Sequence, residues 1–349
     1  MMEHGGDWAG FQREYGGVPL DFSANVSPLG LPEGVREAVD RALGEAGWYP
    51  DPLCRVLREK LGACYGVPPE WILCGCGAAD LIYRLAAVKR GGRALLTAPA
   101  FSEYENALAL WGCQVSRFAL REETGFAVTE DILSAVTPGL DLLFLCEPNN
   151  PTGRTTDRRL LDRILERCAQ CGTLLAVDEC FNDLLDDPEG HTLLSQLPRR
   201  ENLLVLRAFT KSRGLAGLRL GYVLSRNRAL LEAMEHAGPP WAVSGPAQAA
   251  GIAALEDGAY LPALQELVRR ERPRLAAGLA ALGCRVCPGE ANYLLFYCGV
   301  PDLPRKLGER GVLLRDCSNY HGLYPGWYRA AVRGAEENGA FLNIMKEVL

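Results

Sequence analysis

The feature that most constrains the fold of this chain is an alternation of strand-like and helix-like segments up to about residue 224. Short apolar runs, typical of buried strands, alternate with longer segments whose apolar residues recur at helical spacing. Such alternation predicts an α/β fold, with a mostly parallel sheet and helices on both of its faces. The clearest strand-like segments are 93–97 and 115–120, and the clearest helical segments are 32–45, 52–64 and 102–111.

The pattern changes in the last part of the chain. A long helical stretch runs from Pro246 to about residue 282, and strand-like segments and a closing helix follow it. The strand-like segments are 293–297, 312–315 and 328–332, and the helix begins at Ala335. This change predicts a second, smaller α+β domain, with a hinge in the Pro-Pro-Trp segment 239–241.

Charge and hydropathy argue against several classes of function. The 349 residues include 37 Lys and Arg against 43 Asp and Glu, a net charge of −6 without a basic run. A nucleic-acid partner is therefore not expected. No apolar stretch reaches the ~20 residues that span a bilayer, and the N-terminus shows no apolar signal core. We expect a cytoplasmic protein without a membrane partner.

Thirteen cysteines raise the alternative of a structural zinc site. The pairs Cys168/Cys171 and Cys284/Cys287 have the spacing of zinc ligands. However, the first pair ends a helical pattern, where cysteines three residues apart are usually small core residues, and more than a hundred residues separate the two pairs. We expect no metal, and reduced thiols rather than a disulfide framework.

Four short motifs lie at turns and strand ends and follow one another along the chain. They are the glycine turn 75–80, the Asn-Pro turn 148–153, Asp178 at the end of an apolar run, and the loop from Lys211 to Arg219. Taken alone, each has an ordinary structural explanation, because glycine and Asn-Pro turns connect elements in most folds. Together they offer more: a glycine turn that opens a helix binds phosphate, and a lysine becomes nucleophilic when burial or a nearby cation lowers its pKa.

In this order the four motifs resemble the fold-type I family of pyridoxal-phosphate (PLP) enzymes, which contains aminotransferases and related decarboxylases. The resemblance implies a large domain built on a mostly parallel, seven-stranded sheet. It also implies that Lys211 bonds covalently to the cofactor aldehyde and that Asp178 keeps the cofactor's pyridine nitrogen protonated. The other residues implied to hold the cofactor are Gly77, Ala78, Ala79, Phe101, Asn150, Thr210 and Arg219.

The resemblance also implies how the chain is divided and how it assembles. Residues 31–243 would form the large PLP-binding domain, and the N-terminal arm, 1–30, would join 244–349 in the small domain. Tyr49, in a Tyr-Pro-Asp-Pro segment, resembles the tyrosine that reaches the cofactor phosphate of a neighbouring subunit. A homodimer is therefore expected.

Within the family, several segments resemble threonine-phosphate decarboxylases more than histidinol-phosphate aminotransferases. The most specific segment is 315–333, and Phe181 stands where the aminotransferases have a tyrosine. This resemblance implies decarboxylation of L-threonine O-3-phosphate to (R)-1-amino-2-propanol O-phosphate in cobalamin biosynthesis.

An amino acid phosphate carries two anionic groups, and arginine's planar fork suits both of them. By resemblance, Arg329 would bind the α-carboxylate and Arg315 the phosphate, with help from Asn25 and His4.

The main alternative is an aminotransferase of the histidinol-phosphate type, which uses the same lysine. Residue types leave open the choice between the two reactions. They also leave open phosphothreonine against phosphoserine, because one methyl group changes binding by only ~1–3 kcal/mol. A regulator built on the same fold would lack the lysine, whereas Lys211 is present, so we expect an enzyme.

The sequence departs from the family pattern at two places. One is Glu147, before the Asn-Pro turn. The other is the pair Ser212-Arg213, after the lysine, where relatives often have an aromatic residue.

Overall fold

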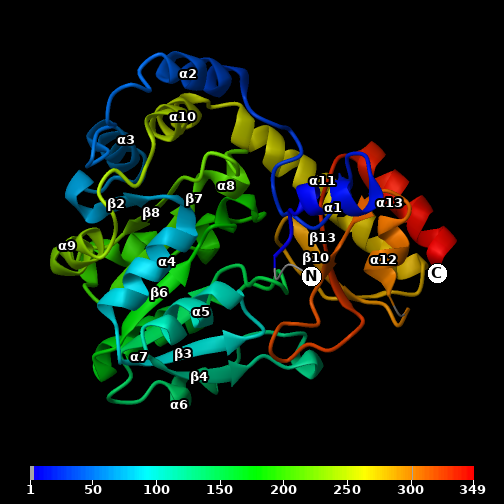
Figure 1. Cartoon of the computed structure of the whole chain (residues 1–349). Coiled ribbons are helices and arrows are strands. Elements are labelled where there is room, and N and C mark those ends of the chain that lie inside the picture. Colours follow the sequence, from blue (N-terminus) through cyan, green and yellow to red (C-terminus); the bar gives the residue numbers. More distant parts are fainter. Residues whose placement is uncertain (1–3, 301) are drawn as a thin grey trace.

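The computed structural model describes residues 4–300 and 302–349. Its largest sheet has seven strands, all parallel except one (Figure 1). The exception, β8, runs antiparallel to both of its neighbours. The predicted mostly parallel, seven-stranded sheet is therefore confirmed. In spatial order, the strands are β2 (Ile72–Gly75), β8 (Gly221–Leu224), β7 (Leu203–Ala208), β6 (Leu174–Asp178), β5 (Leu142–Cys146), β3 (Arg93–Ala98) and β4 (Gln114–Ala119).

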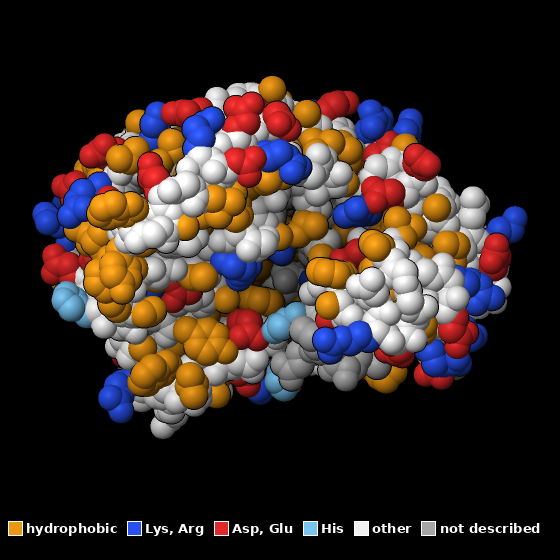
Figure 2. All heavy atoms as spheres, turned by 45° about the horizontal axis from the view of Figure 1, so that its top comes forward, with side chains coloured by type: hydrophobic (Ala, Val, Ile, Leu, Met, Phe, Trp, Pro, Cys, Tyr) orange, Lys and Arg blue, Asp and Glu red, His pale blue; other side chains and the backbone are white. Residues whose placement is uncertain are grey.

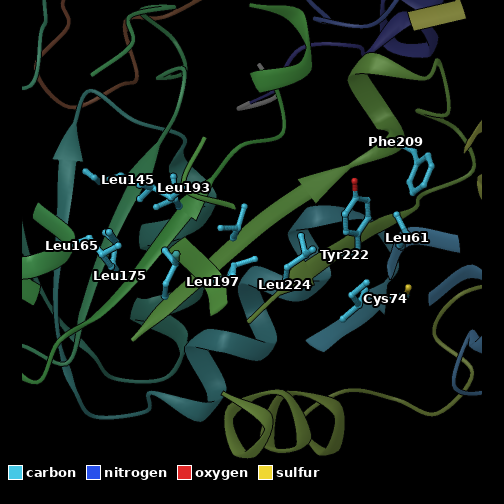
Figure 3. Close-up of a cluster of buried hydrophobic side chains, with 14 of the residues drawn as sticks. Leu61, Cys74, Leu145, Leu165, Leu175, Leu193, Leu197, Phe209, Tyr222 and Leu224 are labelled. Carbon is cyan, nitrogen blue, oxygen red and sulfur yellow. The ribbon is translucent and has the colours of Figure 1, made fainter. Parts of the chain in front are cut away.

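Helices cover both faces of this sheet. Successive side chains of a strand point to opposite faces, so Leu143 and Leu145 join one hydrophobic cluster while Leu142 and Phe144 join another. Figure 3 shows side chains of the first cluster. Because the central strands are buried on both faces, their sequences are continuously apolar. The first cluster includes residues of α3 (Arg55–Tyr65), α7 (Arg158–Cys171) and α10 (Gly245–Glu256), and the second includes residues of α4 (Gly77–Val88), α5 (Ser102–Leu110) and α9 (Arg228–His236).

Local sequence signals set the ends of these helices. The side chain of Asp157 accepts hydrogen bonds from the first backbone N–H groups of α7, and Gly172 ends that helix in the left-handed conformation. The side chain of Ser244 caps α10 in the same way. Helix α2 (Glu33–Leu43) packs against α10. The remaining helices of this part are α6 (Ile132–Ala135), α8 (Phe209–Ser212) and the 3₁₀ turns η1 (Pro69–Trp71), η2 (Glu122–Thr124), η3 (Asn182–Leu184), η4 (Glu189–His191) and η5 (Leu194–Arg199).

The end of the chain forms a smaller α+β unit together with the N-terminal segment (Figure 1). Its antiparallel sheet has the order β12 (Arg315–Asp316), β13 (Trp327–Ala331), β10 (Tyr293–Tyr297), β9 (Arg285–Val286). A parallel pair joins β1 (Leu20–Asp21) to β11 (Val312–Leu313). The division of the chain at residues 30 and 243 stays a prediction. The helices of this unit are α1 (Trp8–Tyr15), α11 (Tyr260–Ala281), α12 (Leu303–Gly308) and α13 (Ala335–Val348).

Two segments differ from the expectation. The helical stretch predicted from Pro246 is broken into α10 and α11, because the Asp257 side chain accepts hydrogen bonds from the backbone N–H groups of Ala259 and Tyr260. The strand expected over 312–315 is divided at Leu314, so that β11 and β12 belong to different sheets.

The topology brings the predicted motifs together. Strands β2, β5, β6 and β7 point the same way, and the glycine turn, the Asn-Pro turn, Asp178 and the lysine turn follow their carboxyl ends. Ligands of open α/β sheets bind beyond this edge. Among the described residues, no helix is both long and apolar enough to cross a membrane.

Candidate active site

The predicted residues converge on a cavity of about 400 Å³. Its walls combine the carboxyl ends of the large-sheet strands with residues of the smaller unit, and Figure 2 shows a hollow between these two parts of the molecule. The predicted residues that line the cavity are His4, Asn25, Ala78, Ala79, Phe101, Asn150, Asp178, Thr210, Lys211, Arg219, Arg315 and Arg329.

Lys211 enters the cavity from α8, directly after β7. Its Nζ lies 5.5 Å from the centre of the Phe181 ring. Burial, together with the guanidinium groups of Arg329 and Arg219, lowers the pKa of Lys211 to about 8. More of the amine is therefore neutral near pH 7 than for an exposed lysine, as a nucleophile requires.

Asp178 occupies the last position of β6 and is buried. Its carboxylate accepts hydrogen bonds from the Tyr104 hydroxyl at 2.7 Å and from the backbone N–H of Cys180 at 2.9 Å. Burial raises the pKa of Asp178, and these hydrogen bonds and Lys211 oppose the rise. The carboxylate is held in one orientation, as a partner for a cationic ring nitrogen needs to be.

The glycine turn forms an anion cradle at the N-terminus of α4. Gly77 has a φ of +80°, and a Cβ at this position would lie 2.8 Å from Nη2 of Arg219. A larger residue would therefore displace the guanidinium. Ala78, Ala79 and Thr210 line the cavity beside Arg219, where the free N–H groups and the dipole of α4 favour an anion. Gly77 borders the cavity without lining it.

Two buried arginines face the cavity from neighbouring strands. Arg315 of β12 and Arg329 of β13 are directly opposed in the antiparallel register, and each is 6% exposed. Like charges at opposed positions repel each other. An anionic ligand between the two guanidinium groups would relieve this repulsion.

Hydrogen bonds orient these arginines. Arg329 donates to Oδ1 of Asn150 at 2.5 Å and to the carbonyl oxygen of Ser23 at 2.8 Å. Arg315 donates to Oδ1 of Asn319 at 2.9 Å, and its guanidinium lies 5.3 Å from the centre of the Tyr320 ring. Oδ1 of Asn25, which is buried beside them, has no hydrogen-bond partner within residues 4–300 and 302–349.

The N-terminal arm reaches the cavity through His4. Nε2 of His4 lies 2.8 Å from Oε1 of Glu103, and its ring centroid lies 5.6 Å from that of Phe101. Tyr83 and Asn106 also donate to the Glu103 carboxylate. These hydrogen bonds, together with His4, lower the pKa of Glu103 against the effect of burial. The arm is thus fixed to the first turn of α5.

Tyr49 lies outside the cavity of its own chain. Its side chain is 80% exposed and stacks on Trp241, with 4.5 Å between ring centroids. Glu147, one of the departures from the family pattern, also points elsewhere: it is buried and accepts a hydrogen bond from the backbone N–H of Thr156 at 2.8 Å.

Sequence reasoning missed several residues that line the cavity. The sequence pattern places Tyr104 and Glu103 only in the helix after Phe101, although a polar residue on the buried side of a helix indicates a specific partner. The others missed as site residues are Gly5, Ser23, Ala24, Cys146, Cys180, Ala208 and Tyr320.

The sequence model of the family "Aminotransferase class I and II" matches residues 18–342. The chain belongs to this family. It is 40% identical over 333 residues to threonine-phosphate decarboxylase of Salmonella typhimurium, covering 95% of this chain and 91% of that one. It is 34% identical to histidinol-phosphate aminotransferase of Symbiobacterium thermophilum, covering 97% and 93%. The expected resemblance is confirmed, and the decarboxylase is the more similar of these two.

A solved structure supports the fold. The histidinol-phosphate aminotransferase of Sinorhizobium meliloti, determined in complex with pyridoxal-5'-phosphate, superposes with a TM-score of 0.87 at 23% identity, covering 98% of this chain and 94% of that one. PLP is the cofactor of the family, as expected from the motifs. The cavity fits it, because an anion cradle, a buried carboxylate and a lysine of lowered pKa share one space. The described residues contain no group of three or more side chains placed to hold a metal.

Proposed function

We propose that this chain is a PLP-dependent decarboxylase that converts L-threonine O-3-phosphate to (R)-1-amino-2-propanol O-phosphate. The observation that carries the proposal is the placement of two buried arginines, Arg315 and Arg329, in the same cavity as Lys211 and Asp178. The 40% identity to the Salmonella decarboxylase supports the same reaction.

The chain's own residues would hold the cofactor at both ends. Ala78, Ala79, Thr210 and Arg219 line one cavity and would surround the cofactor phosphate, while Phe101 would offer an aromatic face to the ring. Lys211 would bind the aldehyde, while Asp178 would pair with the ring nitrogen. When bound, PLP supplies a ring that accepts the electron pair of a bond broken at the substrate's Cα.

The opposed arginines would bind the two anionic groups of the substrate. Arg329, fixed by Asn150 and the Ser23 carbonyl, would hold the α-carboxylate. Arg315, with Asn25 and His4, would bind the phosphate. The orientation of the carboxylate decides which bond at Cα breaks, because that bond must stand perpendicular to the ring. Lys211, with a pKa of about 8, would return a proton to Cα.

A CO₂ assay tests this proposal. Purified protein supplied with PLP and L-threonine O-3-phosphate should release CO₂ and form one amino-alcohol phosphate per CO₂, while K211A should not. A parallel reaction with histidinol phosphate and 2-oxoglutarate tests the alternative. Glutamate formation there, without CO₂ from threonine phosphate, would contradict the proposal and favour an aminotransferase. A third reaction with O-phosphoserine measures the contribution of the methyl group.

We also propose a homodimer, in which Tyr49 of each subunit reaches the neighbouring cavity. Trp48 and Tyr49 are 82% and 80% exposed, beside the half-exposed Trp241. Such a contiguous aromatic surface favours burial against another protein surface. Light scattering should give twice the chain mass of 38.0 kDa. A monomer at micromolar concentration would contradict this assembly.

A further inference from the structure

We propose that Ser212 and Asp183 are positioning residues that join the turn carrying Lys211 to the strand end carrying Asp178. The inference rests on the proposed role of Lys211 as the cofactor lysine. It concerns a polar network behind the cavity, in which Ser212, Arg207 and Glu179 are buried and Asp183 is partly exposed. Neither Ser212 nor Asp183 lines the cavity itself.

The network begins next to the lysine. Ser212 follows Lys211 in α8 and is 1% exposed. Successive side chains of a helix point about 100° apart, so Lys211 enters the cavity while Ser212 points into the protein behind it. The Ser212 hydroxyl donates a hydrogen bond to Oδ2 of Asp183 at 2.8 Å.

The network continues from Asp183 to the end of β6. Oδ1 of Asp183 accepts from Nη1 of Arg207 at 2.7 Å, and Nη2 of Arg207 donates to Oε2 of Glu179 at 2.6 Å. Glu179 directly follows Asp178 in the chain. A chain of short, directed contacts therefore connects the neighbour of Lys211 to the neighbour of Asp178.

The contacts of Asp183 make it the junction of this network. Arg207 donates to one oxygen of its carboxylate and Ser212 to the other, so loss of either donor leaves one oxygen without that hydrogen bond. Its backbone carbonyl accepts from Nε2 of Gln265 on α11 at 2.8 Å, which links the junction to the smaller unit. Buried networks of paired charges and hydrogen bonds hold their members in one arrangement. The distance from Lys211 to Asp178 is the dimension that this arrangement would fix.

Two conservative variants with matched controls test the inference. S212A removes the donor. Its control, S225A, removes another buried hydroxyl, which donates to the Leu203 carbonyl at 2.7 Å. Leu203 begins β7, at the end of the strand away from Lys211. D183N leaves one acceptor where two are needed, and D186N changes a half-exposed carboxylate that pairs with Arg269 and Arg272 nearby. The holoenzyme of each is titrated from pH 5 to 10 by the absorbance of the lysine-bound cofactor.

S212A and D183N should move the midpoint of this titration to higher pH by about half a unit or more, because a loosened turn lets water reach the lysine. The kcat for threonine phosphate should fall on the order of 10-fold, with KM changed much less. S225A and D186N should keep the midpoint and the kcat of the wild type. S212T retains a hydroxyl and should have a midpoint and kcat closer to the wild type than S212A.

An unchanged midpoint and kcat in both S212A and D183N would overturn the inference. The titration needs no substrate, so it remains informative if the proposed reaction is wrong. A shifted midpoint in an enzyme that releases no CO₂ would uphold the positioning role while contradicting the decarboxylase proposal.

Discussion

Lys211 and Asp178 face one cavity with pKa values displaced in opposite directions, and burial is the first cause of both shifts. Burial penalises the charged form of each group, so the cavity on its own favours a neutral amine and a neutral acid. A cationic ring nitrogen beside Asp178 would favour its ionised form, whereas the neutral amine of Lys211 suits attack on an aldehyde. The same burial therefore suits both residues to the roles that we propose for them.

Replacing Tyr104 by Phe should shift the acid limb of the pH–rate profile. The variant keeps the ring that stacks on Phe144 at 4.6 Å but removes the hydrogen bond to Asp178. Loss of a donor to the charged form raises the pKa of Asp178 further, so activity should be lost at a higher pH than in the wild type. We expect kcat/KM near pH 7 to fall about 10-fold. An unchanged profile would show that Tyr104 does not tune Asp178.

Replacing Arg329 by Gln should remove the guanidinium fork that we propose binds the α-carboxylate, and kcat/KM should fall by about 10²-fold or more. R333Q is the matched control, since Arg333 lies just beyond β13 and pairs with Glu337 outside the cavity. Steady-state kinetics of both variants on threonine phosphate provide the comparison. Equal losses in the two variants would argue against a specific role for Arg329.

Helix α5 serves two functions at its start. Phe101 precedes the helix and lines the cavity, while Glu103 in its first turn binds His4 of the N-terminal arm. Three donors share the Glu103 carboxylate, so this carboxylate is held in place at the edge of the cavity. Helix α5 thus holds His4 of the arm, while the Gly6 backbone N–H donates to Oγ of Ser23.

Replacing Glu103 by Gln should release His4 from its position over the cavity. The charge-assisted bond is lost, so KM for threonine phosphate should rise about 5-fold with a smaller change in kcat. E105Q is the control on the same helix, because Glu105 pairs with Arg117 away from the arm. A KM unchanged in E103Q would show that the arm does not contribute to substrate binding.

Much of the whole molecule could be predicted from the sequence. The central strands are buried on both faces and therefore read as apolar runs, and the motifs that follow them must meet because parallel strands end at the same edge. The opposed positions of Arg315 and Arg329 could not be predicted, because they depend on an antiparallel register. Nor could the bond from Tyr104 to Asp178, which joins residues 74 positions apart. Such contacts are fixed by tertiary packing rather than by local pattern.

Glu147 should make the stability of the whole protein depend on pH. Burial raises its pKa to about 8 from a usual value near 4.5. The folded protein therefore holds a proton that the unfolded chain releases, and stability contributed by Glu147 is lost as pH rises from about 4.5 to about 8. E147Q has no such proton to lose and can still bond Thr156. In urea unfolding, the free energy of unfolding of E147Q relative to the wild type should rise by on the order of 2–4 kcal/mol across this pH window. A difference that stays constant with pH would contradict the raised pKa of Glu147.

Chemical trapping of the cofactor on its lysine tests the central assignment most directly. The chain has five lysines, Lys60, Lys89, Lys211, Lys306 and Lys346, and Lys211 is the one that lines the cavity described above. Borohydride reduction of the holoenzyme, followed by proteolysis and mass spectrometry, locates the cofactor. The structure predicts its added mass on the peptide containing Lys211, and none in K211A. The same mass on any other lysine, or on none, would contradict the active site proposed here.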